Sequence, residues 1–213
     1  MLRTEFHGDI VMVTGATAGF GLAVARKFHA AGARIIAVGR RQDRLTALQN
    51  EMGDRLLPLA LDVGDTTAIA REMEQLPEDY RDLSILVNNA GFGIDRGTAQ
   101  DASLADWDDM VDVNIRGLLH MTHHSLRGML ARGRGQIINI GSVAGRAVGP
   151  TNAVYSATKS FVLQFTKALK TDLIGTPVRA SYIAPVRQRP NSRWSAGRET
   201  RRGPPRPMPG ISP

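Results

Sequence analysis

The sequence contains no cysteine among its 213 residues, and this absence excludes disulfide bonds, thiol catalysis and cysteine metal sites. It also lacks an apolar run long enough to span a membrane, and residues 1–9 carry no apolar stretch typical of a signal peptide. These absences predict a cytoplasmic protein. The length predicts one domain that can bury a sizeable core.

The positive charge of the chain is concentrated near its C-terminal end. Residues 186–213 hold seven arginines and one glutamate, a balance of +6, which leaves only +1 of the total of +7 for residues 1–185. The same segment contains six prolines and no periodic apolar face, so we predict a disordered or loosely attached tail. A basic tail could bind nucleic acid or anionic lipid, but this one has a single aromatic residue, Trp194, and no amphipathic period. We therefore favour a solvated or artefactual tail.

Short apolar runs alternate with helix-length amphipathic segments in the rest of the chain. This alternation predicts an α/β fold, a doubly wound parallel sheet with helices on both faces. Glycines just beyond the helical segments mark helix ends, where a left-handed residue is favoured. The predicted strands are residues 10–14, 34–39, 56–61, 83–88, 136–141 and 178–184, the predicted helices are residues 20–31, 42–52, 66–76, 104–132 and 152–174, and the glycines are Gly32, Gly53, Gly133 and Gly175.

A glycine-rich turn connects the first predicted strand to the first predicted helix, where residues 14–21 read TGATAGFG. Its glycines permit a tight turn and close backbone approach, and the helix N-terminus offers N–H groups to a pyrophosphate. The alternative is a plain tight turn, but the position after the first strand favours a dinucleotide site. The candidate cofactor contacts are Gly15, Thr17, Gly19, Phe20 and Gly21.

Two arginines follow the second predicted strand, at the place where an acidic residue would contact the ribose of NAD. The guanidinium groups of Arg40 and Arg41 suit a 2′-phosphate, so we predict NADP rather than NAD; the alternative is two solvated arginines. Asp62, after the third strand, could accept a hydrogen bond from the adenine amino group. The turn after the fourth strand could line the cofactor or simply hold its own shape, and its candidates are Asn88, Ala90 and Gly91.

Tyr155 and Lys159 lie four residues apart on a predicted helix, so their side chains share one face. A cation favours phenolate, and lowering the pKa of a tyrosine from about 10 to about 7 takes roughly 4 kcal/mol of differential stabilisation. Tyr155 would then serve as a general acid and base near neutral pH. The alternative at this spacing is a packed tyrosine with a lysine beside it. Ser142, at the end of the fifth predicted strand, adds a third polar group.

Four motifs, in this order and on these elements, resemble the short-chain dehydrogenase/reductase family. They are the glycine turn of residues 15–21, the NNAG sequence of residues 88–91, Ser142, and the pair Tyr155 and Lys159. The match covers residues 9–185. The resemblance implies a Rossmann-like fold and an oxidoreductase that transfers a hydride between NADP(H) and an alcohol or carbonyl substrate. Stretches within the chain are similar to the branch that includes NADP-dependent serine and 3-hydroxy acid dehydrogenases, which implies a small hydroxy acid.

The resemblance also implies roles for single residues. Ser142 would polarise the substrate oxygen, Tyr155 would pass the proton, and Lys159 would hold the nicotinamide ribose and lower the pKa of the tyrosine. Asn114 matches the family's helix asparagine, which supports a water leading protons to the lysine; the alternative is an ordinary buried asparagine. Pro185 would belong to the cofactor site. Because family members often form dimers or tetramers, a homo-oligomer is expected. The implied chemistry needs no metal, so no metal site is expected.

The sequence departs from the family pattern after Pro185. Family members continue with Pro-Gly, a threonine-containing loop, helices over the substrate and a final strand, whereas this chain continues with Val186 and the basic tail. Suitable synonymous codons for residues 186–194, read in a shifted frame, can spell Gly-Pro-Thr-Ala-Thr-Glu-Phe-Ser-Leu, which is very like the family's loop. We therefore expect a frame shift that leaves out the C-terminal helices and the last strand. Residues 1–185 would then be an incomplete dinucleotide-binding catalytic domain with weak or absent activity.

Two other classes of function stay open. A non-catalytic dinucleotide-binding protein is compatible with the missing loop, and the basic tail is compatible with a nucleic-acid binder. The intact Ser142, Tyr155 and Lys159 favour the oxidoreductase over both.

Three histidines, His120, His123 and His124, share one face of a predicted helix, a spacing that could hold a metal. No acidic or cysteine partner accompanies them, so we favour a solvated or interface face of the helix.

Overall fold

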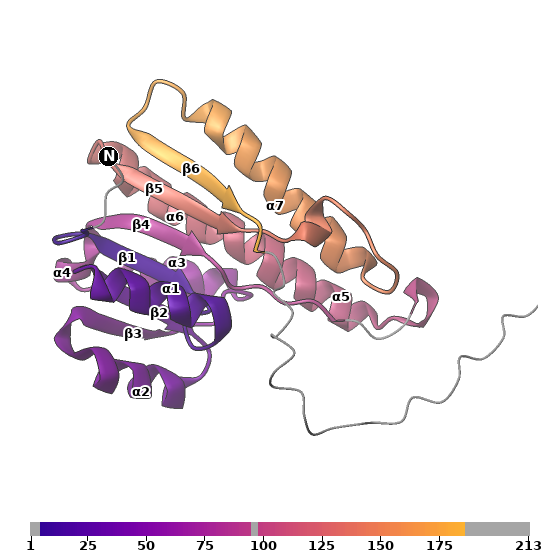
Figure 1. Ribbon diagram of the computed structural model, residues 1–213, viewed down its shortest axis with the longest axis horizontal. Helices are drawn as coiled ribbons and strands as arrows, with labels where there is room; N and C mark the ends of the chain where they lie inside the picture. The colour runs from indigo at the N-terminus through magenta and orange to yellow at the C-terminus, as the bar shows by residue number, and fades with distance from the viewer. Residues whose placement is uncertain (1–4, 95–97, 186–213) are drawn as a thin grey trace, which may run out of the picture.

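The computed structural model describes residues 5–94 and 98–185, and Figure 1 shows how their helices and strands are arranged. The predicted tail, residues 186–213, lies outside the described residues, and so does the segment to which the predicted frame shift applies. One sheet of six parallel strands forms the centre of the described structure.

The strands follow the order β3-β2-β1-β4-β5-β6 across the sheet. The chain therefore starts in the middle, builds outward to β3, returns to the middle and builds outward to β6, which confirms the predicted doubly wound fold. The reversal between β1 and β4 leaves a crevice at the carboxyl ends of the strands, where ligands bind in such sheets. The strands are β1 (Ile10–Thr14), β2 (Arg34–Gly39), β3 (Leu56–Ala60), β4 (Leu83–Asn88), β5 (Gly135–Ile140) and β6 (Val178–Ile183).

Two apolar layers cover the two faces of the sheet. Successive residues of a strand point to opposite faces, so Met12 and Ile36 join one layer, which also receives side chains from α3, α6 and α7. Val11, Ile35 and Leu45 join the other layer, beneath α1 and α2. All five residues of β1 are buried, as expected of a central strand covered on both sides. These helices are α1 (Gly19–Ala30), α2 (Gln42–Met52), α3 (Thr66–Glu74), α6 (Leu118–Ala131) and α7 (Ala153–Asp172).

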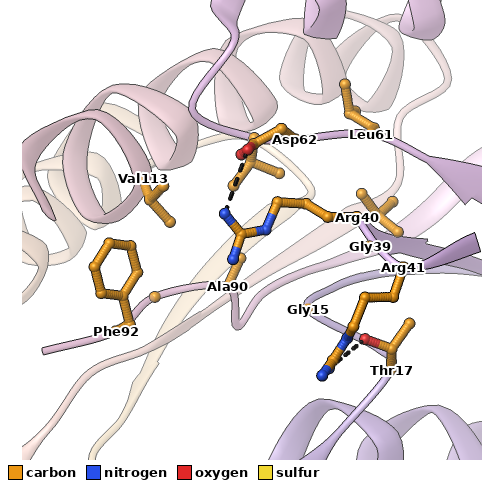
Figure 2. Close-up of a pocket in the computed structure, with 13 residues that line it drawn as sticks. Gly15, Thr17, Gly39, Arg40, Arg41, Leu61, Asp62, Ala90, Phe92 and Val113 are labelled. Atoms are coloured by element: carbon orange, nitrogen blue, oxygen red, sulfur yellow. Dashed lines mark hydrogen bonds and ion pairs between the residues drawn. The ribbon is translucent and has the colours of Figure 1, made fainter. Parts of the chain in front are cut away.

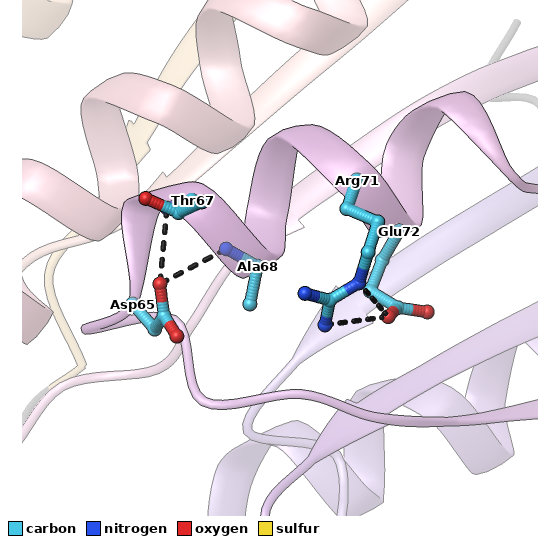
Figure 3. Close-up of polar contacts among 5 residues, drawn as sticks. All are labelled: Asp65, Thr67, Ala68, Arg71 and Glu72. Atoms are coloured by element: carbon cyan, nitrogen blue, oxygen red, sulfur yellow. Dashed lines mark hydrogen bonds and ion pairs between the residues drawn. The ribbon is translucent and has the colours of Figure 1, made fainter.

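Local sequence signals explain where several helices begin and end. Asp65 begins α3, because its carboxylate accepts hydrogen bonds from the N–H groups of Thr67 (3.0 Å) and Ala68 (2.9 Å), as Figure 3 shows. One turn further on, Arg71 and Glu72 form an exposed ion pair of 3.1 Å. The predicted helix-end glycines are confirmed by their left-handed backbone, with φ of +96° at Gly32, +68° at Gly53, +67° at Gly133 and +82° at Gly175.

The prediction of one regular helix over residues 104–132 is wrong in detail. The segment is divided into α5 (Leu104–Val111), a π-helical turn (Asp112–Gly117) and α6. A π turn inserts an extra residue without changing the apolar period of the flanking helices, so the sequence pattern does not reveal it. Gly117 ends the turn in close contact with the backbone at Val63, where a Cβ would overlap the carbonyl oxygen.

A short helix that the sequence did not predict, α4 (Glu78–Arg81), precedes β4. Its Tyr80 is buried and donates a hydrogen bond from its hydroxyl to the carbonyl oxygen of Asp54 at 3.2 Å. The arginine Arg34 stacks on the same ring, 4.3 Å from its centroid. This contact fixes the turn between α3 and β4 at the end of the sheet away from the crevice.

β6 is one of the two edge strands of the described sheet, and β3 is the other. Val178 and Ala180 are buried whereas Arg179 is exposed, so this strand has one covered face, unlike β1. Within residues 5–94 and 98–185, no helix is both long enough and apolar enough to cross a membrane.

Candidate active site

A cavity of about 310 Å³ opens at the carboxyl ends of β1, β2, β3 and β4 (Figure 2). It brings together many of the residues predicted for the cofactor, although they come from four separate elements. Pro185, the last described residue, is half-buried beyond β6 and is not among the residues that line this cavity. The predicted residues in its wall include Gly15, Thr17, Arg40, Arg41, Asp62 and Ala90.

The glycine-rich turn forms the base of this cavity. Gly15 has a φ of +66° and Gly19 one of +54°, a left-handed backbone that favours glycine at both positions. A Cβ on Gly21 would overlap the Gly15 carbonyl oxygen, so α1 starts directly against the turn. The N-cap of α1, Ala18, supplies no side-chain hydrogen bond to the first turn. The N–H groups of that turn are therefore suited to an anion. The predicted contact Phe20 is half exposed beside them.

Two arginines extend over the cavity from the end of β2. Arg40 pairs with Asp62 at 3.5 Å between Nη1 and Oδ2, and Arg41 donates from Nη2 to the hydroxyl of Thr17 at 3.0 Å (Figure 2). Asp62 also accepts a hydrogen bond of 2.9 Å from the N–H of Gly64. The side chains of Arg40 and Asp62 are 69% and 45% exposed, so both can exchange these contacts for a ligand at little cost.

The two asparagines after β4 hold the turn. Asn88 is buried and donates to the hydroxyl of Thr122 (3.0 Å) and the amide oxygen of Asn139 (2.9 Å). Asn89 donates to the carbonyl oxygen of Thr14 at 2.9 Å, which ties the end of β4 to the end of β1. These contacts indicate that Asn88 holds the turn, and they favour this alternative over a contact with the cofactor.

Lys159 lies beneath Tyr155 with its ammonium buried. Its side chain crosses to β5 and donates to the carbonyl oxygen of Ile140 at 3.1 Å, and its Nζ lies 5.8 Å from the centroid of the Tyr155 ring. Burial lowers the pKa of Lys159 to about 8. The predicted proximity of the two side chains is thus present, and the cation sits where little water screens it.

The loop after β4 passes very close to both side chains. A Cβ on Gly91 would lie 3.1 Å from Nζ of Lys159 and 3.0 Å from Oδ1 of Asn114, and a Cβ on Gly93 would lie 2.8 Å from the Tyr155 ring. A side chain at Gly91 would crowd the two polar groups, and one at Gly93 would overlap the Tyr155 ring. The sequence analysis identified Gly91 but not Gly93. The sequence GFG at residues 91–93 could have indicated that the backbone passes close to another group at both positions.

Asn114 fastens the same loop to the π-helical turn. Its Oδ1 accepts from the N–H of Phe92 (3.0 Å), and its Nδ2 donates to the carbonyl oxygen of Phe92 (2.8 Å) and the hydroxyl of Thr158 (3.1 Å). Only 1% of Asn114 is exposed, whereas Phe92 is partly buried. The structure thus places the predicted asparagine where the loop meets α7.

Ser142 follows β5 and begins a short 3-10 helix, η4 (Val143–Gly145). Its hydroxyl accepts from the N–H of Ala144 at 3.1 Å. Its main chain is held by Tyr182, whose hydroxyl accepts from the Ser142 N–H (3.2 Å) and donates to the Ser142 carbonyl oxygen (3.1 Å). Sequence reasoning missed Tyr182, because nothing in the local pattern of β6 links it to a residue on another strand.

A second cavity, of about 280 Å³, lies beside Tyr155 between the starts of α5 and α7. Ile94, Trp107 and Met110 give it an apolar wall, and the loop that contains Thr151 forms the opposite side. Thr151 has a φ of +64°, which is strained for a β-branched residue. Tyr155 therefore has space for a small molecule next to its ring.

The three histidines lie together on α6, away from this site. The ring of His124 is 5.6 Å from that of His123 and 6.4 Å from that of His120. Partial burial and the neighbouring histidines lower the pKa of His124. Among the described residues, no group of three or more histidine, aspartate or glutamate side chains is arranged to hold a metal ion.

Comparisons with known proteins identify a family and several similar chains. The model of the family described as short chain dehydrogenase matches residues 9–198. The NADP-dependent 3-hydroxy acid dehydrogenase YdfG of Salmonella typhi is 50% identical over 176 residues, which cover 83% of this chain and 71% of the relative. Sulfoacetaldehyde reductase 2 of Chromohalobacter salexigens is 47% identical over 180 residues, with the same coverage of both chains.

A solved structure shares the fold at similar identity. The closed form of serine dehydrogenase complexed with NADP+ superimposes with a TM-score of 0.81 at 48% identity, over 83% of this chain and 71% of that one. The serine dehydrogenase from Escherichia coli gives a TM-score of 0.80, also at 48% identity, over 83% of this chain and 82% of that one.

Proposed function

The chain belongs to the short-chain dehydrogenase family, and we propose on this basis that it is an oxidoreductase that transfers a hydride between NADP(H) and a small alcohol or carbonyl substrate. The observation that carries the proposal is the position of Tyr155 between the buried ammonium of Lys159 and a cavity large enough for a small molecule. A structural tyrosine would need neither neighbour.

The residues at the first cavity fit the adenosine half of NADP. The N-terminus of α1 would hold the pyrophosphate, and the guanidinium groups of Arg40 and Arg41 would bind the 2′-phosphate. The carboxylate of Asp62 pairs with Arg40 and would hold that guanidinium in place. The guanidinium of Arg41 would turn from Thr17 to the phosphate. Two cations and one anion at this position favour NADP over NAD.

Catalysis would rest on three side chains of this chain together with the hydride that bound NADPH supplies. Ser142 would donate a hydrogen bond to the substrate oxygen and orient it. Tyr155 would give its phenolic proton to that oxygen during reduction and take it back during oxidation. Lys159 would stabilise the phenolate that remains, because its ammonium is buried near the ring.

The names of the relatives suggest the substrate class. A 3-hydroxy acid, serine and sulfoacetaldehyde all carry an acid group close to the reacting carbon. We infer a small hydroxy acid, or the corresponding aldehyde or ketone, as the substrate of this chain. The apolar wall of the second cavity, with Ile94, Trp107 and Met110, leaves room for a short carbon chain.

A homo-oligomer in the cytoplasm belongs to the same proposal. On α7 the rings of Phe161 and Phe165 stack 5.9 Å apart and are only partly covered in the single chain, which suits a face shared between two copies. Light scattering coupled to gel filtration tests it: a mass of two or four chains supports the proposal, and a monomer at micromolar concentration contradicts it.

The proposed function is tested by titrating NADPH and NADH into the purified protein and following the nucleotide fluorescence, alongside Tyr155→Phe. We expect tighter binding of NADPH than of NADH by both proteins. Weak reduction of small aldehydes and keto acids is expected from the unchanged chain, because the family's loop after Pro185 is missing. We expect at least 100-fold less from Tyr155→Phe, on the order of the effect of one general acid. Binding without turnover in both would identify a non-catalytic dinucleotide-binding protein, and binding of neither nucleotide would contradict the whole proposal.

A further inference from the structure

Tyr182 lies on β6, 40 residues beyond Ser142, and its hydroxyl contacts both polar groups of that serine's main chain. It accepts from the Ser142 N–H at 3.2 Å and donates to the Ser142 carbonyl oxygen at 3.1 Å. Among the hydrogen bonds of the described residues, the Ser142 N–H donates to this hydroxyl alone. One oxygen atom on the edge strand therefore holds the serine's backbone on both sides of its Cα.

The tyrosine ring is itself fixed in place. It lies so close to Gly141 that a Cβ there would overlap the ring, and the Gly141 N–H donates to the carbonyl oxygen of Ile183 at 2.7 Å. The guanidinium carbon of Arg146, just beyond η4, lies 5.8 Å from the ring centroid, within the range of a cation–π contact. The glycine before Ser142 and the arginine after it thus both contact the ring that holds it.

Ser142 needs such a support because regular structure ends at its position. β5 stops at Ile140, and η4 after it is only three residues long. The serine has an extended backbone (φ −158°, ψ 158°), and its hydroxyl caps η4 through the N–H of Ala144. A short helix and a strand end alone would let the hydroxyl shift, whereas an active-site donor must stay within a fraction of an ångström of its place.

We propose that Tyr182 is a positioning residue for Ser142: its hydroxyl fixes the serine main chain, and through it the point at which the serine hydroxyl meets the substrate oxygen. The inference rests on the proposed function, because it assigns Tyr182 a role in the same reaction. Tyr182 does not itself touch the reacting atoms, so its effect is expected to pass through Ser142.

Tyr182→Phe tests the proposal, because it keeps the ring on Gly141 and removes only the hydroxyl. We expect kcat for carbonyl reduction to fall about tenfold, as for loss of orientation of one catalytic donor, while the Kd for NADPH stays within about twofold. In a Ser142→Ala background the same change should alter kcat less than about twofold, since the group that Tyr182 positions is already gone. An equal loss in both backgrounds would show a merely structural role and overturn the proposal.

A second measurement does not depend on turnover. Hydrogen exchange followed by mass spectrometry should show faster exchange in a peptide that covers residues 141–146 for Tyr182→Phe than for the unchanged chain. Tyr80→Phe is the matched control, because its hydroxyl also donates to a main-chain carbonyl, that of Asp54, far from the site. Exchange at 141–146 that is unchanged in Tyr182→Phe, or equally faster in Tyr80→Phe, would overturn the proposal. If the unchanged chain reduces no substrate, the proposed function fails, and the exchange result still decides whether Tyr182 holds Ser142.

Discussion

The buried ammonium of Lys159, which the proposed function requires beside Tyr155, lowers the stability of the fold. Burial lowers its pKa from 10.5 to about 8, so the folded protein binds fewer protons than the unfolded chain between about pH 8 and 10.5. The cost of burying this cation is therefore fully present below pH 8 and disappears as the pH rises through that window.

Lys159→Met should reveal this cost. At pH 7 the variant is expected to be more stable than the unchanged chain by an amount on the order of 1 to 3 kcal/mol. This difference should disappear as the pH rises toward 10. Urea unfolding at pH 7 and pH 10 measures the difference. Lys167→Met, on the exposed side of the same helix, is the control and should show no pH-dependent difference. A difference between Lys159→Met and the unchanged chain that stays constant with pH would show that burial of the charge is not the cause.

The proposed function gives Arg41 the task of distinguishing NADPH from NADH. The Arg41 guanidinium donates to Thr17 and would turn from it to bind a 2′-phosphate. Arg41→Ala removes this group, so the Kd for NADPH should rise about 10- to 100-fold. The Kd for NADH should change less than about threefold, because NADH lacks that phosphate. Fluorescence titration gives both values, and Arg26→Ala, which removes an arginine paired with Glu51 outside the cavity, is the control. Equal weakening of both nucleotides would contradict the assignment.

At the scale of elements, the π-helical turn serves to aim Asn114 at the loop after β4. The Asn114 side-chain amide hydrogen-bonds to both the N–H and the carbonyl oxygen of Phe92, in the way that the backbone of a neighbouring strand would. It also donates to the hydroxyl of Thr158 on α7. Asn114→Ala removes the partner of the partly buried Phe92 N–H and carbonyl, while the Thr158 hydroxyl keeps its bond to the carbonyl oxygen of Tyr155. We therefore expect a loss of about 2 to 4 kcal/mol of unfolding free energy. Urea unfolding tests this, with Asn50→Ala on the exposed face of α2 expected to change it by less than about 0.5 kcal/mol. A similar small change at Asn114 would mean that the loop holds its shape without this clamp.

The sequence predicted elements better than the contacts between them. Runs such as residues 10–14 and 34–39 are apolar enough to mark buried strands, and their bounds agree with β1 and β2. The π turn escaped prediction because the apolar period continues on both sides of it. The contact between Tyr182 and Ser142 escaped because it depends on the pairing of β5 with β6, which no local spacing encodes.

The site follows the same division. The glycines of the turn after β1 and the Tyr155 and Lys159 pair were predictable, since each depends on spacing within one segment. The burial of Asn88 was not, because its partners Thr122 and Asn139 come from two other elements.

At the scale of the whole molecule, the cavity proposed for the cofactor and the basic segment belong to different parts of the chain. The residues that line the cavity fall between Gly15 and Val113, whereas most of the net charge lies in residues 186–213. A chain that stops after Pro185 should therefore bind 2′,5′-ADP with a Kd within about twofold of the full chain, which calorimetry can measure. Retention on DNA that disappears on this deletion and weakens with salt would instead support the nucleic-acid alternative. The gene's nucleotide sequence around the codon for Pro185 decides whether residues 186–213 are read out of frame.

The place of β1 in the sheet also has a consequence for protein synthesis. β1 ends at Thr14, but its second neighbour, β4, begins only at Leu83. At about 5 to 20 residues per second, the ribosome needs roughly 3 to 14 s to make the intervening chain. During that time the β3-β2-β1 half can form, with one edge of β1 unpaired and its apolar residues open to other nascent chains. Chaperones on the ribosome should therefore bind this chain most strongly while residues 15–88 are being added.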